Sequence, residues 1–365
     1  MAEQETTWPR LEPYRSTLGE DGAVAWLEGL KEAASGGGEV RVVTHAKPDG
    51  DAFGSVVAVV GTLRAIGVAA RGYVVPPVPP GIEQLPGQEM VTVLADEAAV
   101  TELAATAGGS TVIVDTGAWS QLGALAEVVA GGLERTLLID HHLSGDVPAG
   151  ERLIDTGAAA CCEVLWPIVR RLLDGAGVAM PEAVRDGLYA GLASDTGWFR
   201  FSNTRPGTLR AAADLIELGT DHTLLYETLN QSERPEKLKL LRAAIDRLEL
   251  LFGARVAVMS LRRADFEAAG AREEETERMV DLPQVVATVR VVVLVCERLD
   301  GKGCKLSFRS KPAPADGSGP EAVNVAAIAG LFGGGGHARA AGAKSGAGLE
   351  ETLGLLRERL AEFMT

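Results

Sequence analysis

Short β-branched runs alternate with longer stretches of helical spacing in the first half of the chain, and this alternation limits the fold more than any other feature. The run at residues 39–44 is followed by helical spacing at 51–66, and glycines and prolines separate such segments. Further strand candidates lie at 72–75, 111–114 and 136–139, between Ala- and Leu-rich stretches. Strands that alternate with helices predict βαβ units, and therefore an α/β fold with a doubly wound parallel sheet.

The second half has a different order of strand and helix candidates, which predicts a second, smaller α/β domain. Its strand candidates are residues 256–260, 289–296 and 304–310, and a helix is expected at 323–331. A chain of 365 residues also exceeds the usual size of one hydrophobic core. We therefore expect four parts: a flexible N-terminal arm at 1–18, a larger domain at 19–215, a helical connector at 216–250 and the smaller domain at 251–365.

Charge and composition exclude several classes of protein. The formal net charge of −15 repels a long phosphate backbone, and aromatic residues at 5% give little surface on which single strands can stack. A protein that slides along long DNA is therefore excluded, whereas short nucleotides remain possible partners. No apolar stretch approaches the roughly 20 residues of a membrane span, and residues 1–10 lack the apolar region of a secretory signal. We expect a cytoplasmic protein without membrane contact.

Histidine and aspartate are concentrated in a few short patterns. The chain has five histidines, and four of them lie in three segments, namely 44–51, 140–142 and 333–337. Three of the acidic or histidine positions directly follow strand candidates: His45, Asp115 and the segment 140–142. Ligands of open α/β sheets bind beyond the carboxyl ends of the strands, so these side chains are expected to face one crevice.

The residue types at this crevice favour a site for two divalent metal ions. With Asp195, the acidic candidates Asp49, Asp51 and Asp115 carry a charge of about −4, which two divalent cations neutralise, whereas without metal they would repel one another. Mixed oxygen and imidazole ligands favour Mn²⁺ over Mg²⁺. Each segment alone has an ordinary interpretation, since 48–51 resembles a loop turn and Asp115 a helix N-cap, but their combination favours a metal site.

Glycines and cations provide candidate contacts for phosphate. The run at 333–336 precedes His337 and is interpreted as a tight turn at which backbone N–H groups approach a phosphate, although a flexible linker has the same composition. Arg309 lies upstream of this run, and Arg200 follows Asp195 closely. The candidate substrate contacts are Arg309, Gly334, Gly335, Gly336, His337 and Arg200.

In these motifs, and in their order, the chain resembles the DHH phosphoesterase family with its C-terminal DHH-associated domain. The matching segments are 44–55, 114–115, 139–142, 195–203 and 332–342. The resemblance is to two-domain bacterial nanoRNases that also dephosphorylate 3′-phosphoadenosine 5′-phosphate, and to actinobacterial relatives that act on linear or cyclic di-adenosine monophosphate. It implies that residues 19–215 form the catalytic domain, that 251–365 bind the substrate, and that the protein is a homodimer.

The resemblance also implies a role for each motif residue. One Mn²⁺ ion is expected on His45, Asp49 and Asp115, and the other on Asp51, Asp115, His141 and Asp195, with Asp115 between them. His142 is expected to support the second ion or the substrate phosphate, and Asp140 to orient its neighbours. Some positions depart from the family pattern without removing a ligand: Lys47 stands where Asn is frequent, 158–160 are alanines in place of a polar patch, and Asn324 replaces a frequent Asp.

Three alternatives to a phosphoesterase of linear short nucleotides remain open. The first is a phosphodiesterase that opens cyclic di-adenosine monophosphate. The second is a pyrophosphatase, which is disfavoured because such a site needs several cations around the leaving phosphate and no base pocket. The third is a nucleotide-binding module without activity, which is disfavoured because every expected ligand position is filled.

Overall fold

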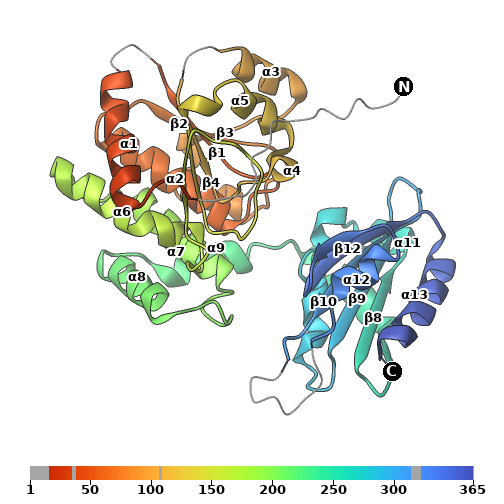
Figure 1. Ribbon diagram of the computed structural model, residues 1–365. Helices are drawn as coiled ribbons and strands as arrows, with labels where there is room; N and C mark the ends of the chain where they lie inside the picture. Colours follow the sequence, from red (N-terminus) through yellow and green to blue (C-terminus); the bar gives the residue numbers. More distant parts are fainter. Residues whose placement is uncertain (1–15, 35–37, 107–108, 314–321, 365) are drawn as a thin grey trace. The chain divides into compact units, whose positions relative to one another are not determined.

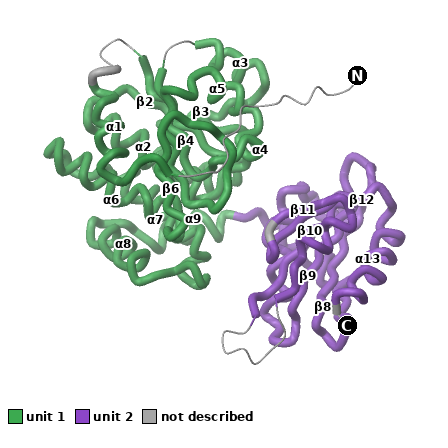
Figure 2. The backbone as a smooth tube through the Cα atoms, viewed as in Figure 1, with its two compact units in different colours: residues 1–232 green, residues 233–365 purple. Residues whose placement is uncertain are grey.

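The computed structural model describes residues 16–34, 38–106, 109–313 and 322–364. The chain divides into two compact units, residues 1–232 and 233–365 (Figure 2), and each is described by itself. Most of the predicted arm at 1–18 lies outside the described residues. Its last residues do not form a free arm, because the backbone N–H groups of Thr17 and Leu18 both donate to the carbonyl of Arg152.

The first unit is built on a six-stranded sheet with the order β3-β2-β1-β4-β5-β6, in which every pair of neighbours is parallel. The prediction of a doubly wound parallel sheet is confirmed. The strand order reverses between β1 and β4, which marks the switch point at which such sheets bind ligands. The strands are β1 (Val40–Val43), β2 (Ala70–Val74), β3 (Val91–Val93), β4 (Thr111–Val114), β5 (Thr136–Asp140) and β6 (Glu151–Ile154).

Helices cover both faces of this sheet (Figure 1), and each face has its own buried cluster of apolar side chains. One face packs against α1 (Glu20–Ala34), α2 (Gly50–Ala65), α6 (Cys161–Ala176) and α7 (Glu182–Asp195). The other packs against α3 (Glu97–Ala105), α4 (Trp119–Leu122) and α5 (Ala126–Ala130). The unit is completed by α8 (Pro206–Glu217), α9 (His222–Asn230) and the short 3-10 helices η1 (Ile82–Gln84), η2 (Gln88–Met90), η3 (Gly123–Leu125) and η4 (Leu133–Arg135).

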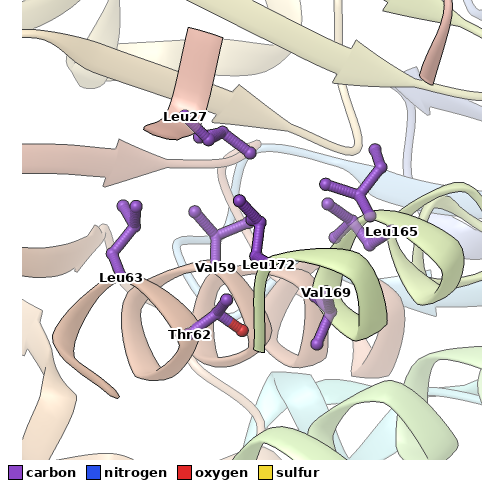
Figure 3. A pocket seen from close by; sticks show the side chains of 8 residues that line it. Leu27, Val59, Thr62, Leu63, Leu165, Val169 and Leu172 are labelled. Carbon is purple, nitrogen blue, oxygen red and sulfur yellow. The ribbon is translucent and has the colours of Figure 1, made fainter. Parts of the chain in front are cut away.

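A small cavity of about 10 Å³ lies in the core between α1, α2 and α6 (Figure 3). Its lining is apolar except for Thr62, and the other lining residues are Leu27, Val59, Leu63, Leu165, Ile168, Val169 and Leu172. It contains no group suited to catalysis and belongs to the packing of the unit. Within the described residues, no helix combines the length and the apolarity needed to span a bilayer.

The second unit contains a mixed six-stranded sheet with the order β11-β12-β10-β9-β8-β7, of which only the β8–β9 pair is parallel. Its strands are β7 (Glu249–Leu251), β8 (Val256–Leu261), β9 (Val291–Glu297), β10 (Cys304–Ser310), β11 (Gly335–His337) and β12 (Ala340–Ser345). Its helices are α10 (Pro235–Asp246), α11 (Arg263–Ala269), α12 (Val325–Gly330) and α13 (Leu349–Met364), with η5 (Glu273–Thr276) and η6 (Met279–Val285) between β8 and β9.

The predicted helical connector at 216–250 needs correction. The boundary between the units falls at Ser232, so α9 belongs to the first unit and α10 to the second. Leu240 and Ala244 of α10 are fully buried in an apolar cluster of the second unit. A leucine-rich helix next to a domain boundary has therefore packed onto a sheet.

Candidate metal centre

The predicted metal residues gather at the switch point of the first sheet. His45 lies just beyond β1, Asp115 directly follows β4, and His141 directly follows β5. Strands β1, β4 and β5 are adjacent, so their carboxyl ends bring these side chains to one edge of the sheet. The backbone N–H of Asp115 donates to the carbonyl of Ile139 at 3.0 Å, which fixes the aspartate against β5.

One group of possible metal donors consists of His45, Asp49 and Asp115. The Nε2 atom of His45 lies 3.5 Å from Oδ2 of Asp115 and 4.0 Å from Oδ1 of Asp49. Asp49 is the N-cap of α2, where its Oδ1 accepts from the backbone N–H groups of Asp51 and Ala52. An aspartate at this position stabilises the start of the helix and keeps its second oxygen available.

A second group consists of Asp51, His141 and Asp195. The Nε2 atom of His141 lies 3.3 Å from Asp195 Oδ2, 3.4 Å from Asp115 Oδ1 and 3.9 Å from Asp51 Oδ2. Asp51 comes from the first turn of α2, and Asp195 is the last residue of α7. Asp115 therefore contacts a histidine of each group, His45 through one oxygen and His141 through the other.

Asp140 orients the two histidines that follow it. Its Oδ1 accepts from the backbone N–H groups of His141 and His142, at 2.8 and 3.2 Å, and lies 2.7 Å from Nδ1 of His142. The carboxylate is fully buried, whereas the imidazole of His142 is partly exposed. His142 also forms a third possible donor group with Asp115 and His141.

Two buried polar atoms at the centre of the cluster could be satisfied by a bound cation. Oδ1 of Asp115 and Nε2 of His141 are inaccessible to solvent and lie 3.4 Å apart, but neither atom makes a contact with the geometry of a hydrogen bond. Unsatisfied buried polar atoms are costly, so native sites pair them with a ligand or an ion. Nδ1 of His141 lies 3.4 Å from the carbonyl of Ala158, a contact that leaves the lone pair on Nε2 for a metal. The residues therefore suit divalent cations.

The buried charges of the cluster shift the pKa values of its own side chains. Burial disfavours a charged imidazole, but the carboxylates of Asp115, Asp195 and Asp51 raise the pKa of His141 to about 11. For His45, Asp115 and Asp49 likewise outweigh burial and raise the pKa to about 9. Burial, together with like charges, raises the pKa of Asp51 well above its usual value. Metal-free, the cluster holds protons where a cation would otherwise neutralise it.

None of the predicted substrate contacts belongs to the possible metal-donor groups of the described residues. Arg200 is exposed, and its Nε donates to the carbonyl of Gly197. In the second unit, Arg309 of β10 lies 3.4 Å from Asp281. The glycine run is not a turn throughout, because Gly335–His337 form the edge strand β11, paired with β12. A Cβ on Gly334 or Gly336 would come within 2.6 Å of the backbone of β12, so close strand contact requires glycine there. The side chain of His337 lies outside the described part of the chain.

Some contacts of the site were not expected from the sequence. The backbone N–H groups of Cys161 and Cys162 donate to the two oxygens of Asp51, and the side chain of Asn203 donates to the carbonyl of Asp195. The first contact carries no side-chain signal, because any residue offers the same backbone donor. The second involves Asn203, which lies inside the family motif at 195–203 but was not predicted to have a role in the site.

A cluster of carboxylates and imidazoles at the switch point of an α/β sheet is typical of enzymes that use divalent metal ions. The family described as "DHH family, N-terminal domain" matches residues 39–192. The bifunctional oligoribonuclease and PAP phosphatase NrnA of Thermus thermophilus is 30% identical over 330 residues, which cover 90% of this chain and 91% of that protein. The chain belongs to the DHH family, and it is a hydrolase of phosphoester bonds.

Solved structures show the same fold. An exopolyphosphatase-related protein of Bacteroides fragilis superposes with a TM-score of 0.81 at 20% identity, covering 94% of this chain and 96% of its own. RecJ of Thermus thermophilus in complex with Mn²⁺ gives a TM-score of 0.55 at 17% identity, covering 97% of this chain and 56% of its own. Both alignments include residues of the first and of the second unit of this chain.

Proposed function

We propose that this enzyme is a manganese-dependent phosphodiesterase and phosphatase that hydrolyses short nucleotides to mononucleotides. Its substrates would be linear di-adenosine monophosphate, nanoRNA and 3′-phosphoadenosine 5′-phosphate. The observation that carries this proposal is the convergence of two donor groups on Asp115, whose two oxygens lie 3.5 Å from His45 and 3.4 Å from His141. The similarity to an oligoribonuclease and PAP phosphatase over 90% of the chain supports the substrate class.

Each side chain has a defined role in this proposal, and Asp115 alone would serve both ions. One ion would be held by His45, Asp49 and Asp115, and the other by Asp51, Asp115, His141 and Asp195. Two such ions lower the pKa of water and stabilise charge on a phosphoryl oxygen. The chain's own contribution is to hold the donors in place: Asp140 fixes the backbone of His141 and His142, and His142 presents a partly exposed imidazole to the phosphate.

Manganese is proposed because of the chemistry of the donors. Imidazole nitrogen mixed with carboxylate oxygen suits Mn²⁺ better than Mg²⁺, which prefers oxygen alone. The nearby thiols belong to none of the possible donor groups in the described residues, since the Sγ of Cys161 donates to the carbonyl of Ile139 and that of Cys162 lies 3.3 Å from the hydroxyl of Ser55. RecJ of Thermus thermophilus, a fold relative, binds Mn²⁺ in its solved structure, so the fold is compatible with this metal.

Substrate contacts, assembly and location stay predictions. The proposed contacts are Arg200, which follows Asp195 closely in the sequence, and, on the second unit, Arg309, Gly334, Gly335, Gly336 and His337. Arg309 would exchange its ion pair with Asp281 for a substrate phosphate. We expect a homodimer in the cytoplasm that does not bind long DNA.

A panel of short nucleotides tests the proposal. The full-length protein is incubated with Mn²⁺ and linear di-adenosine monophosphate, its cyclic form, 3′-phosphoadenosine 5′-phosphate, pyrophosphate and RNA of two to about 24 residues. Chromatography then separates released mononucleotide from inorganic phosphate. Mn²⁺-dependent release of mononucleotide from the shortest linear substrates is expected. Preferential opening of the cyclic form would favour the cyclic phosphodiesterase, and no metal-dependent turnover of any phosphoester would refute the proposal.

A further inference from the structure

One short loop contacts two residues of the second donor group, Asp51 and His141, and is linked to the third, Asp195, through the side chain of Asn203. This loop, residues 158–162, ends in the first turn of α6 and is called here the 158–162 loop. We propose that the loop, together with Asn203 and Glu163, positions Asp51, His141 and Asp195 for the second metal ion. This inference rests on the proposed two-metal function and adds positioning residues to it.

The contact with Asp51 comes from the start of α6. The N-cap residue of α6, Ala160, has no side chain that can cap the helix. Instead, the N–H of Cys161 donates to Oδ2 of Asp51 at 2.6 Å, and the N–H of Cys162 donates to Oδ1 at 2.9 Å. The carboxylate is thus fixed in rotation through both oxygens, while each oxygen retains a lone pair. The positive end of the helix also favours its ionised form.

The contacts with His141 and Asp195 come from two consecutive carbonyl groups of the loop. The carbonyl of Ala158 lies 3.4 Å from Nδ1 of His141. The carbonyl of Ala159 accepts from Nδ2 of Asn203 at 3.1 Å, and the same amide donates to the carbonyl of Asp195, also at 3.1 Å. Asn203 therefore ties the end of α7, which carries Asp195, to the loop that holds Asp51.

Glu163 anchors the loop to a third helix. Its Oε2 accepts from the N–H of Ala159 at 2.7 Å, and both of its oxygens accept from the hydroxyl of Thr208 in α8. The loop is packed against the core on one side and faces a surface hollow on the other. Ala159 and Ala160 are buried, whereas Ala158 and Glu163 line a surface hollow of about 250 Å³.

The first donor group is held by different bonds. Asp49 is fixed as the N-cap of α2, and the N–H of Ala46, next to His45, donates to the carbonyl of Gln121. Neither bond involves the loop, Asn203 or Glu163. Weakening the loop is therefore expected to affect one metal ion more than the other.

Mn²⁺ binding to the metal-free, full-length protein tests this selectivity without any measurement of turnover. Electron paramagnetic resonance counts the free ion during a titration. The wild type should bind two equivalents. In Asn203→Ala, one equivalent should bind about 10- to 100-fold more weakly, which is the usual effect of removing a residue that orients metal ligands, and the other should change by less than about threefold.

Glu163 supplies an independent pair of variants. Glu163→Ala removes both acceptors and should weaken the same equivalent. Glu163→Gln should bind nearly as the wild type does, because its oxygen can accept from Ala159 and its amide can donate to the Thr208 hydroxyl. Should Asn203→Ala fail to fold, this pair decides the question.

A core variant controls for general loss of stability. Leu173→Ala, at the opposite end of α6, opens a cavity and should lower the melting temperature, yet leave both Mn²⁺ equivalents unchanged. The inference would be overturned if Asn203→Ala and Glu163→Ala both bound two equivalents of Mn²⁺ with wild-type affinity. It would also be overturned if Leu173→Ala weakened Mn²⁺ binding as much as they do. Neither result would contradict the proposed function. A wild type that binds no Mn²⁺ would overturn the proposed function as well.

Discussion

Asp115 is the residue on which the whole site depends. It is buried, it contacts a histidine of each donor group, and its backbone has a φ of 60°. Left-handed backbone costs about 1 kcal/mol or more for a residue with a side chain, although aspartate tolerates it better than most. The strained turn after β4 aims the carboxylate into the cluster. Strain of this kind is concentrated at functional positions.

Asp115→Asn should lower kcat/KM by more than about 100-fold, because the neutral amide is a poor shared ligand for two cations. Loss of a residue that only orients a metal ligand already lowers metal affinity or activity by about 10- to 100-fold. Asparagine has the same shape and also tolerates positive φ, so circular dichroism should show the fold retained. Asp221→Asn is the matched control, since asparagine caps α9 as well as aspartate does. Near-normal turnover in Asp115→Asn would contradict the shared role.

The histidines predict how the stability of the metal-free protein depends on pH. Folding raises the pKa of His45 from 6.5 to about 9 and that of His141 to about 11. A raised pKa stabilises the fold fully below 6.5, and this stabilisation is lost as the pH rises through the folded-state value. The melting temperature of the chelated protein should therefore fall between pH 6.5 and 9. With Mn²⁺ the trend should reverse, because metal binding requires neutral imidazoles. A flat profile in chelator would show that the histidines are not protonated.

At the scale of elements, glycines allow α2 and α7 to pack closely enough to bring their ends together. A Cβ on Gly50 would lie 1.9 Å from the hydroxyl of Ser194, one on Gly54 would lie 2.2 Å from the carbonyl of Gly187, and one on Gly191 would lie 2.5 Å from Asp51. The start of α2 carries Asp49 and Asp51, and the end of α7 carries Asp195. The close contact therefore sets the distance between metal donors.

Gly54→Ala should destabilise the protein by about 1–3 kcal/mol, because the new methyl group meets backbone that cannot turn aside. It should also weaken Mn²⁺ binding, since α7 must move with Asp195. Gly29→Ala in α1 is the control: nothing lies within 4 Å of the new Cβ, and the better helix former should add about 0.5–1 kcal/mol. Urea unfolding measures both. Equal stability of the two variants would refute the packing argument.

Strands were predicted correctly from the sequence where an apolar run is followed directly by polar residues. The runs that became β1, β4 and β5 are buried and branched, and the chemistry at their ends identified the metal residues. This pattern missed β3, which has only three residues, and β6, whose sequence begins Glu-Arg. It also missed the bonds that orient the ligands. Those bonds come from backbone groups of the 158–162 loop, and only the fold determines where backbone groups lie.

Across the full chain, the length and the change in strand pattern predicted two units but not their boundary. A leucine-rich helix can join a core on either side, and α10 packs in the second unit through Leu240 and Ala244. Net charge is a property that the sequence determines directly. With 50 acidic and 35 basic side chains, the protein carries a formal charge of −15. This field disfavours every additional phosphate of a substrate.

Salt should therefore reduce the preference for short substrates. At low ionic strength, kcat/KM for a dinucleotide should exceed that for a 24-residue RNA, because the longer polyanion meets more repulsion. Raising the salt from about 50 to 300 mM shortens the Debye length from roughly 14 to 6 Å, and the ratio of the two values should shrink severalfold. Competition between the two RNAs in one reaction measures this ratio directly. A ratio that grows with salt would show that local cations bind the long RNA, and a ratio near one at low salt would refute the preference itself.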